Sequence, residues 1–156
     1  MPLFLSTKTP LHRLIYYSRS NVPSTPQSST LVRDIVEVAA RRNTAVGVTG
    51  ALLLCRGWFL QALEGRPDAV KEIYTRIRAD RRHTHVTIIA DDRVRAREFG
   101  GWSMCGRELS ATDEAIVDSL EASAKFDVST LTAHSALRLL SKVRDQQMRN
   151  RSPLSV

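Results

Sequence analysis

The chain has 156 residues and a formal net charge of +7, and 42% of its residues are hydrophobic. This length suits one domain with a short appendage, and the composition is typical of a globular protein. No segment reaches the roughly 20 apolar residues of a membrane helix, and residues 1–10 lack the apolar region of a signal peptide. We therefore expect a cytoplasmic protein with no membrane partner.

Neither the basic residues nor the two cysteines predict a partner by themselves. Basic residues are spread along the chain and concentrate only between Lys142 and Arg151. No aromatic-rich RNA-binding strand motif accompanies them, so we do not expect nucleic acid as a partner. Cys55 and Cys105 have neither zinc nor disulfide spacing, and we expect both to pack as small apolar side chains.

The first half of the chain predicts a strand, a helix and a hairpin. Residues 13–18 form a β-branched and aromatic run typical of a strand. After a Pro/Ser/Thr-rich loop, a helix is expected from an N-cap at Ser28 or Ser29 to about Asn43. Residues 48–55 and 58–64 have the pattern of two strands joined by a tight turn. The apolar stripe of the helix comprises Leu31, Ile35, Val38 and Ala39.

The second half predicts a helix, two strands and a helical tail. Pro67 suits the first position of a helix whose apolar stripe ends at Ile77. Strands are expected at 86–90 and at 99–105. The tail predicts a short helix over about 112–122 and a longer helix over about 129–148. One face of the longer helix comprises Ala133, Ala136, Leu137, Leu140 and Val143.

This order of elements predicts an α+β fold. Strand-helix-strand-strand-helix-strand-strand is the ferredoxin-like arrangement with one extra strand, and both of its helices should cover one sheet face. We expect a domain over 1–110 and a C-terminal helical cap or signalling extension over 111–156. The last helix could pack on the free sheet face or form a dimer contact, and packing on its own sheet is favoured.

Gln61 is a polar residue on an apolar strand face. Side chains two apart on a strand share a face, so Phe59, Gln61 and Leu63 point the same way. A buried amide without partners costs about 1–3 kcal/mol. Gln61 should therefore have hydrogen-bond partners, either backbone groups or a bound polar heterocycle, unless it occupies a solvent-exposed position on an edge strand. The strand pattern alone favours the backbone-bonded amide or the edge position over the heterocycle.

The predicted fold brings two further polar residues towards Gln61. Strands one and three are neighbours in a ferredoxin-like sheet, so the Tyr16 hydroxyl could adjoin the Gln61 amide. Asn43 lies near the end of the first helix, where an asparagine is also a common cap. His83 and His85 are two apart, but this spacing is weak as a metal motif, and we expect no metal site.

Residues 13–106 resemble a BLUF domain, a flavin-binding module that senses blue light. Order and spacing agree over about 95 residues, and Asn43 stands six residues before the Thr49-Gly50 pair. The matching motifs are Leu14-Ile15-Tyr16, Gly50-Ala51-Leu52-Leu53, Phe59-Leu60-Gln61-Ala62-Leu63-Glu64-Gly65, Asp80-Arg81-Arg82-His83 and Phe99-Gly100-Gly101-Trp102-Ser103-Met104.

The resemblance implies a non-covalently bound flavin between the two helices, FAD in the first place, with FMN or riboflavin as alternatives. Asn43 matches the asparagine that bonds the carbonyl side of the ring. Arg82 and His83 match polar residues at the pyrimidine end, and Ile35 matches an aliphatic residue on the ring face. Arg42 stands where some relatives have asparagine or histidine.

The resemblance also implies a photochemical role for two of these residues. Tyr16 matches the tyrosine that gives an electron and then a proton to the excited flavin. Gln61 matches the glutamine between that tyrosine and the flavin edge. Trp102 and Met104 match a pair implicated in passing the signal outward, and either could lie next to Gln61.

These implications describe a photoreceptor that is not an enzyme. We expect a homo-oligomer, a dimer or a larger ring, that relays light to a separate, unidentified signalling protein. Two alternatives from other classes are an acylphosphatase-type enzyme and a basic nucleic-acid-binding regulator. The enzyme would need a Gly-rich phosphate loop, whereas the loop after residues 13–18 is rich in Pro, Ser and Thr.

Overall fold

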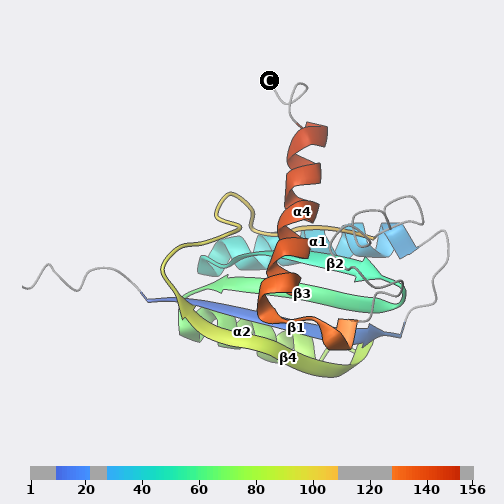
Figure 1. Ribbon diagram of the computed structural model, residues 1–156, viewed down its shortest axis with the longest axis horizontal. Helices are drawn as coiled ribbons and strands as arrows, with labels where there is room; N and C mark the ends of the chain where they lie inside the picture. The colour runs from blue at the N-terminus through green and yellow to red at the C-terminus, as the bar shows by residue number, and fades with distance from the viewer. Residues whose placement is uncertain (1–9, 22–27, 109–127, 152–156) are drawn as a thin grey trace, which may run out of the picture.

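The computed structural model describes residues 10–21, 28–108 and 128–151. A five-stranded sheet has the order β4-β1-β3-β2-β5, and every pairing is antiparallel except that of β2 with β5 (Figure 1). The strands are β1 (Leu11–Ser20), β2 (Thr49–Cys55), β3 (Trp58–Gly65), β4 (His83–Val94) and β5 (Cys105–Glu108).

Helices cover both faces of this sheet. The first two, α1 (Ser28–Val46) and α2 (Pro67–Arg78), lie on one face, and α4 (Ala133–Arg151) crosses the other (Figure 1). A 3-10 turn, η3 (Val128–Thr130), precedes α4. The ferredoxin-like fold with an extra strand and a C-terminal helix is therefore confirmed. No helix in the described ranges is long and apolar enough to cross a membrane.

Local sequence signals explain where several elements begin and end. Pro67 occupies the start of α2, as predicted, since its missing N–H has no partner in a first turn anyway. Helix α1 runs three residues past the predicted end at Asn43 and stops before Gly47, whose φ of 71° suits glycine at a helix end. Arg56 and Gly57 have φ of 52° and 83°, the left-handed pair of a tight hairpin turn.

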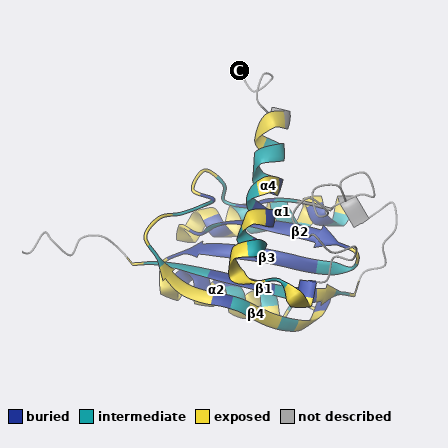
Figure 2. Cartoon of the chain, in the orientation of Figure 1, coloured by how far each residue is buried: buried dark blue, intermediate teal, exposed yellow. Residues whose placement is uncertain are grey.

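The buried apolar residues form two separate cores, and β2 and β3, in the middle of the sheet, are mostly buried (Figure 2). The core under α4 includes Ile15, Leu53, Leu60 and Phe99. The core under α1 and α2 includes Leu14, Val32, Leu52, Phe59, Val70 and Met104. Both cysteines are buried and free, and burial raises the pKa of the Cys105 thiol to about 12.

The predicted fifth strand is wrong in its bounds. Residues 99–104 form turns, and β5 begins only at Cys105. The backbone N–H of Trp102 donates to the Phe99 carbonyl at 2.9 Å, which closes a turn over the two glycines. The apolar residues of this segment serve both cores, because Phe99 packs under α4 and Met104 packs under α1 and α2. These apolar residues led the sequence analysis to expect a strand over 99–105, but the strand begins only at Cys105.

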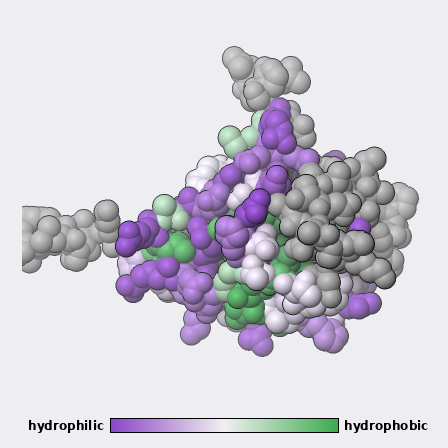
Figure 3. All heavy atoms as spheres, in the orientation of Figure 1, coloured by the Kyte–Doolittle hydropathy of each residue, from purple (hydrophilic) through white to green (hydrophobic). Residues whose placement is uncertain are grey.

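The last helix packs on its own sheet, the arrangement favoured from the sequence. Ala136, Leu140 and Val143 are buried as predicted, but Ala133 is exposed in the first turn of α4. Leu139 is also buried, although it was not in the predicted stripe. The end of α4 projects past the sheet, and its outer side is mainly hydrophilic (Figures 1 and 3). The helix predicted at about 112–122 lies outside the described residues.

Candidate functional site

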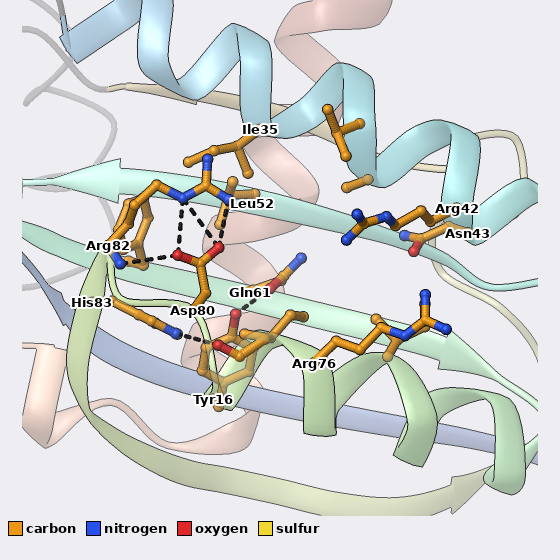
Figure 4. Close-up of a pocket in the computed structure, with 15 residues that line it drawn as sticks. Tyr16, Ile35, Arg42, Asn43, Leu52, Gln61, Arg76, Asp80, Arg82 and His83 are labelled. Atoms are coloured by element: carbon orange, nitrogen blue, oxygen red, sulfur yellow. Dashed lines mark hydrogen bonds and ion pairs between the residues drawn. The ribbon is translucent and has the colours of Figure 1, made fainter.

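A pocket opens between α1 and α2 above the middle of the sheet (Figure 4). Its cavity volume is about 120 Å³. Apolar side chains from both helices and from β2 and β3 form most of its wall, and polar groups form its floor and mouth. The lining residues are Tyr16, Ile35, Val38, Ala39, Arg42, Asn43, Leu52, Phe59, Gln61, Ile73, Arg76, Ile77, Asp80, Arg82 and His83.

Tyr16 and Gln61 form a buried pair on the floor of the pocket. They stand opposite each other in the β1–β3 register, as the sequence predicted. The Tyr16 hydroxyl donates a hydrogen bond to Gln61 Oε1, and the two residues are only 2% and 4% exposed. Burial raises the pKa of Tyr16, with further contributions from Tyr74 and Asp80, so the phenol keeps its proton at neutral pH.

The nitrogen end of Gln61 has a weaker partner. Gln61 Nε2 lies 3.7 Å from Met104 Sδ, and a thioether is a poor hydrogen-bond acceptor. Of the two residues that could adjoin Gln61, Met104 does so here. Trp102 packs against the core under α4, on the opposite side of the sheet. The Gln61 Oε1 therefore accepts a strong hydrogen bond, whereas its Nε2 donor could bind a better acceptor in the pocket.

Asn43 joins the end of α1 to the segment that precedes β5. Its side chain is buried, and Nδ2 donates to the Ser103 carbonyl at 2.9 Å. Thr44 Oγ1 lies 2.6 Å from Ser103 Oγ, which adds a second link. Asn43 also lines the pocket, so a ligand there would contact the same residue that positions Ser103.

Arg82 and Asp80 form an ion pair at one end of the pocket. Arg82 Nη2 lies 2.5 Å from Asp80 Oδ2, and Nε lies 3.0 Å from both carboxylate oxygens. These hydrogen bonds hold the pKa of Asp80 below its usual value, despite its partial burial. The arginine is thus already neutralised by its neighbour.

His83 forms part of the wall through its ring. Its Nε2 donates to the Ile77 carbonyl at 2.5 Å, and its Nδ1 lies 2.7 Å from Ser18 Oγ. The ring packs edge-on against Tyr16, with centroids 6.5 Å apart. Since both ring nitrogens have protein partners, His83 can contact a ligand in the pocket with its ring surface but has no free donor.

The predicted stripe of α1 has an unusual distribution of burial. Ile35, Val38 and Ala39 line the pocket, and Val38 stays 37% exposed. The fully buried valine of this helix is Val32, which the prediction did not include. An apolar stripe that faces a pocket and is left incompletely covered is the surface that an apolar ligand would bury.

The structure adds several pocket residues that the sequence did not single out. Phe59 shares a face with Gln61, and Ile73 and Ile77 are one helical turn apart, so periodicity contains a signal for these. No periodicity in the sequence indicated that Arg76 lines the pocket or that Asp80 pairs with Arg82. Among the described residues no three His, Cys, Asp or Glu side chains gather as metal ligands would.

Comparison with known proteins agrees with this arrangement. The sequence model of the family described as BLUF, sensors of blue light using FAD, matches residues 11–105, more than half of the chain. The β subunit of photoactivated adenylate cyclase from Euglena gracilis is 36% identical over 127 residues. That match covers 80% of this chain but only 14% of the relative, so the chain spans a small part of that protein.

Solved structures are similar over nearly the whole chain. A dark-state structure of BlrB, a BLUF protein, has a TM-score of 0.69 and 26% identity and covers 89% of this chain and 98% of that chain. Klebsiella pneumoniae BlrP1 with FMN and cyclic diGMP has a TM-score of 0.60 and 30% identity. It covers 92% of this chain and 37% of BlrP1.

Proposed function

This chain belongs to the BLUF family of blue-light sensors that use FAD, and on that premise we propose that it is a blue-light receptor with a non-covalently bound flavin between α1 and α2. One observation carries the proposal. The buried Tyr16–Gln61 pair faces a pocket between two helices, and the only partner of the Gln61 Nε2 donor in the described residues is a thioether.

The pocket residues suit a flavin. A flat, largely apolar ring system needs apolar walls, which Ile35, Leu52 and Ile77 supply. Its polar edge needs both donors and acceptors, and the amides of Asn43 and Gln61 have both. Arg82 and His83 would border the pyrimidine end, the guanidinium as a donor and the imidazole as a packing surface. FAD is the expected form, and FMN and riboflavin share the same ring.

Tyr16 and Gln61 would carry the photochemistry. A bound oxidised flavin supplies the absorption of blue light and, once excited, the ability to accept one electron. Tyr16 would provide that electron, and a phenol that has lost an electron becomes strongly acidic. Its proton would then move to Gln61 Oε1, the atom that already accepts its hydrogen bond. Rotation or tautomerisation of the amide would reverse its donor and acceptor pattern. The electron and a proton would then return to the Tyr16 phenol, so no net reaction results and the amide relaxes in darkness.

The signal would pass from Gln61 through Met104 to α4. Met104 directly precedes β5, and the Gln147 side chain of α4 bonds both backbone groups of Gly106. Its Oε1 accepts from the Gly106 N–H at 3.2 Å, and its Nε2 donates to the Gly106 carbonyl at 2.8 Å. Met104 is only two residues from Gly106 along the chain, so a change in the Gln61–Met104 contact would reach α4 over a short distance.

The receptor would act as a sensor rather than an enzyme, with α4 as its output surface. A second copy of the chain and a separate signalling protein are the proposed partners, and Trp102 would join Met104 in relaying the change. Residues 11–105 would hold the flavin, and the helical part that follows would carry the signal.

The absorption spectrum in light and darkness tests the proposal. We expect the purified protein to be yellow and its flavin band to shift slightly to the red under blue light, because a new hydrogen bond to the ring lowers the excitation energy. The band should return in darkness. A colourless preparation that takes up no added FAD, FMN or riboflavin would overturn the proposal.

Replacing Gln147 with leucine should loosen α4 without affecting the flavin spectrum. The change removes two hydrogen bonds, each contributing about 0.5–1.5 kcal/mol. Amide hydrogen exchange of β5 and α4 in the dark should then become at least severalfold faster and respond little to light. Met148→Ala on the exposed side of the same helix is the control. Light-dependent exchange that persists unchanged in the Gln147 variant would contradict this route.

A further inference from the structure

Arg97 lies between β4 and β5, outside the pocket, and has no role in the mechanism above. Its half-buried guanidinium binds three oxygens from three different elements. Nη1 donates to Thr49 Oγ1 at 2.9 Å and to the Glu64 carbonyl at 3.0 Å, and Nη2 donates to the Gly47 carbonyl at 2.9 Å. One side chain therefore joins the end of α1, the start of β2 and the end of β3.

The end of α1 receives its positive charge from Arg97. The last carbonyls of a helix lack partners within the helix and have a partial negative charge, which a cation stabilises. The last turn of α1 contains no basic residue, and the carbonyl of Gly47, the next residue, accepts from Arg97. Asn43, which lines the pocket, is one turn earlier, and its carbonyl accepts the Val48 N–H at 2.9 Å. Arg97 thus fixes the part of α1 that contains a pocket residue.

The segment that begins at Arg97 ends at Met104, whose sulfur adjoins Gln61 Nε2. Near its far end this segment is also attached to β2, because the Trp102 carbonyl accepts the Gly50 N–H at 3.1 Å. Met104 packs tightly there, since a Cβ on Gly50 would lie 3.3 Å from Met104 Cε. The position of the thioether therefore depends on how this segment is held against β2.

The contacts of Arg97 require a guanidinium rather than a positive charge alone. All three acceptors are neutral oxygens, and the Glu64 carboxylate has its own cation, Arg13 Nε at 2.9 Å. A guanidinium offers five donors in a rigid plane, whereas the ammonium of a lysine is a compact charge at the end of a flexible stem. A lysine at position 97 would keep the charge without reaching the three oxygens together.

We propose that Arg97 is a positioning residue for the Gln61 amide: it holds the segment 97–104 against α1, β2 and β3 and thereby sets the contact between Met104 and Gln61. The inference rests on the proposed function only in that this contact would carry the light signal. The positioning itself requires no flavin.

Methyl NMR of the methionines tests the position of Met104 directly. The chain contains three methionines, so methyl-labelled protein gives at most three signals, and a Met104→Leu sample identifies the relevant one. We expect Arg97→Gln to shift or broaden the Met104 signal in both flavin-free and flavin-loaded protein. The signal of Met148, on the exposed side of α4, should stay in place. A general loss of stability would not single out one methyl group in this way.

The rate of dark recovery measures the consequence for the light response. Arg97→Gln should remain yellow and shift to the red, but we expect its band to return at least about threefold faster, because a loosely held segment lowers the barrier to relaxation of the amide. Arg97→Lys should resemble Arg97→Gln in both measurements. It also supplies the comparison if the glutamine variant does not fold.

Arg95→Gln is the matched control, because Arg95 is an exposed residue near Arg97 and the change removes the same charge. Three outcomes would overturn the role of Arg97: an unmoved Met104 signal in Arg97→Gln, an equal effect in Arg95→Gln, and native behaviour in Arg97→Lys. A protein that binds no flavin, or that binds it without a red shift, would instead reject the proposed function. The methyl signals of the flavin-free protein would still decide whether Arg97 positions Met104.

Discussion

We expect replacement of Gln61 with leucine to abolish the proposed light-induced red shift while the protein remains yellow. Leucine is similar in size and keeps the apolar contacts of β3, but it has neither a donor nor an acceptor. The Tyr16 hydroxyl then loses its acceptor, so no amide remains to take its proton or to change its hydrogen bonding to the ring. The difference spectrum between illuminated and dark protein measures the effect, and its red-shift feature should vanish.

Two further variants make the result specific. Tyr16→Phe should also bind flavin and lose the shift, because it removes the donor of the same hydrogen bond. Gln147→Leu is the same substitution on α4, outside the pocket, and should retain the full shift. A normal red shift in either pocket variant would mean that the roles proposed for Tyr16 and Gln61 are wrong.

Replacing Glu64 with alanine lowers the free energy of unfolding by about 3–5 kcal/mol, the loss typical of breaking a buried ion pair. Glu64 is 0% exposed and lies 2.9 Å from Arg13 Nε. Its carboxylate also accepts the backbone N–H groups of Glu98 at 2.8 Å and Phe99 at 2.9 Å. Alanine would leave the Arg13 guanidinium without its carboxylate partner and two backbone N–H donors without an acceptor. Urea unfolding followed by circular dichroism measures the loss.

Glu64 also has a consequence for the site, because it fixes the start of the segment that ends at Met104. We expect the Glu64→Ala red shift to be altered in size or recovery, with Glu64→Gln intermediate because one oxygen remains. Glu72→Ala on the exposed side of α2 is the matched control and should cost no more than about 0.5 kcal/mol. A loss below about 1 kcal/mol for Glu64→Ala would show that other groups satisfy these donors.

The signalling path proposed from the pocket to α4 would include a second contact. Arg144 of α4 bonds Glu98 Oε1 at 3.1 Å, and Ser141 Oγ donates to the same oxygen at 3.0 Å. The backbone N–H groups of Glu98 and of the next residue, Phe99, both donate to the Glu64 carboxylate. The segment between β4 and β5 is thus attached to the sheet on one side and to α4 on the other, which suits it to transmit movement.

Sequence periodicity determined the elements that depend on local chemistry. Alternation placed Gln61 on an apolar face, Arg56-Gly57 predicted the hairpin, and Pro67 predicted the start of α2. The order of elements then implied that β1 and β3 are neighbours, which brought Tyr16 to Gln61. These features follow from residues close together in the chain or from a topology with few alternatives.

Tertiary structure alone decided the contacts between distant segments. Residues 99–104 contain the bulky apolar residues Phe99, Trp102 and Met104, which favoured a strand from sequence, but these side chains enter two different cores. Only the packed chain shows that Met104, rather than Trp102, adjoins Gln61. The same holds for Arg42 and Arg76, which are far apart in sequence and line the same pocket. Which polar group finds which partner depends on how two helices and a sheet are spaced, and local sequence does not encode that spacing.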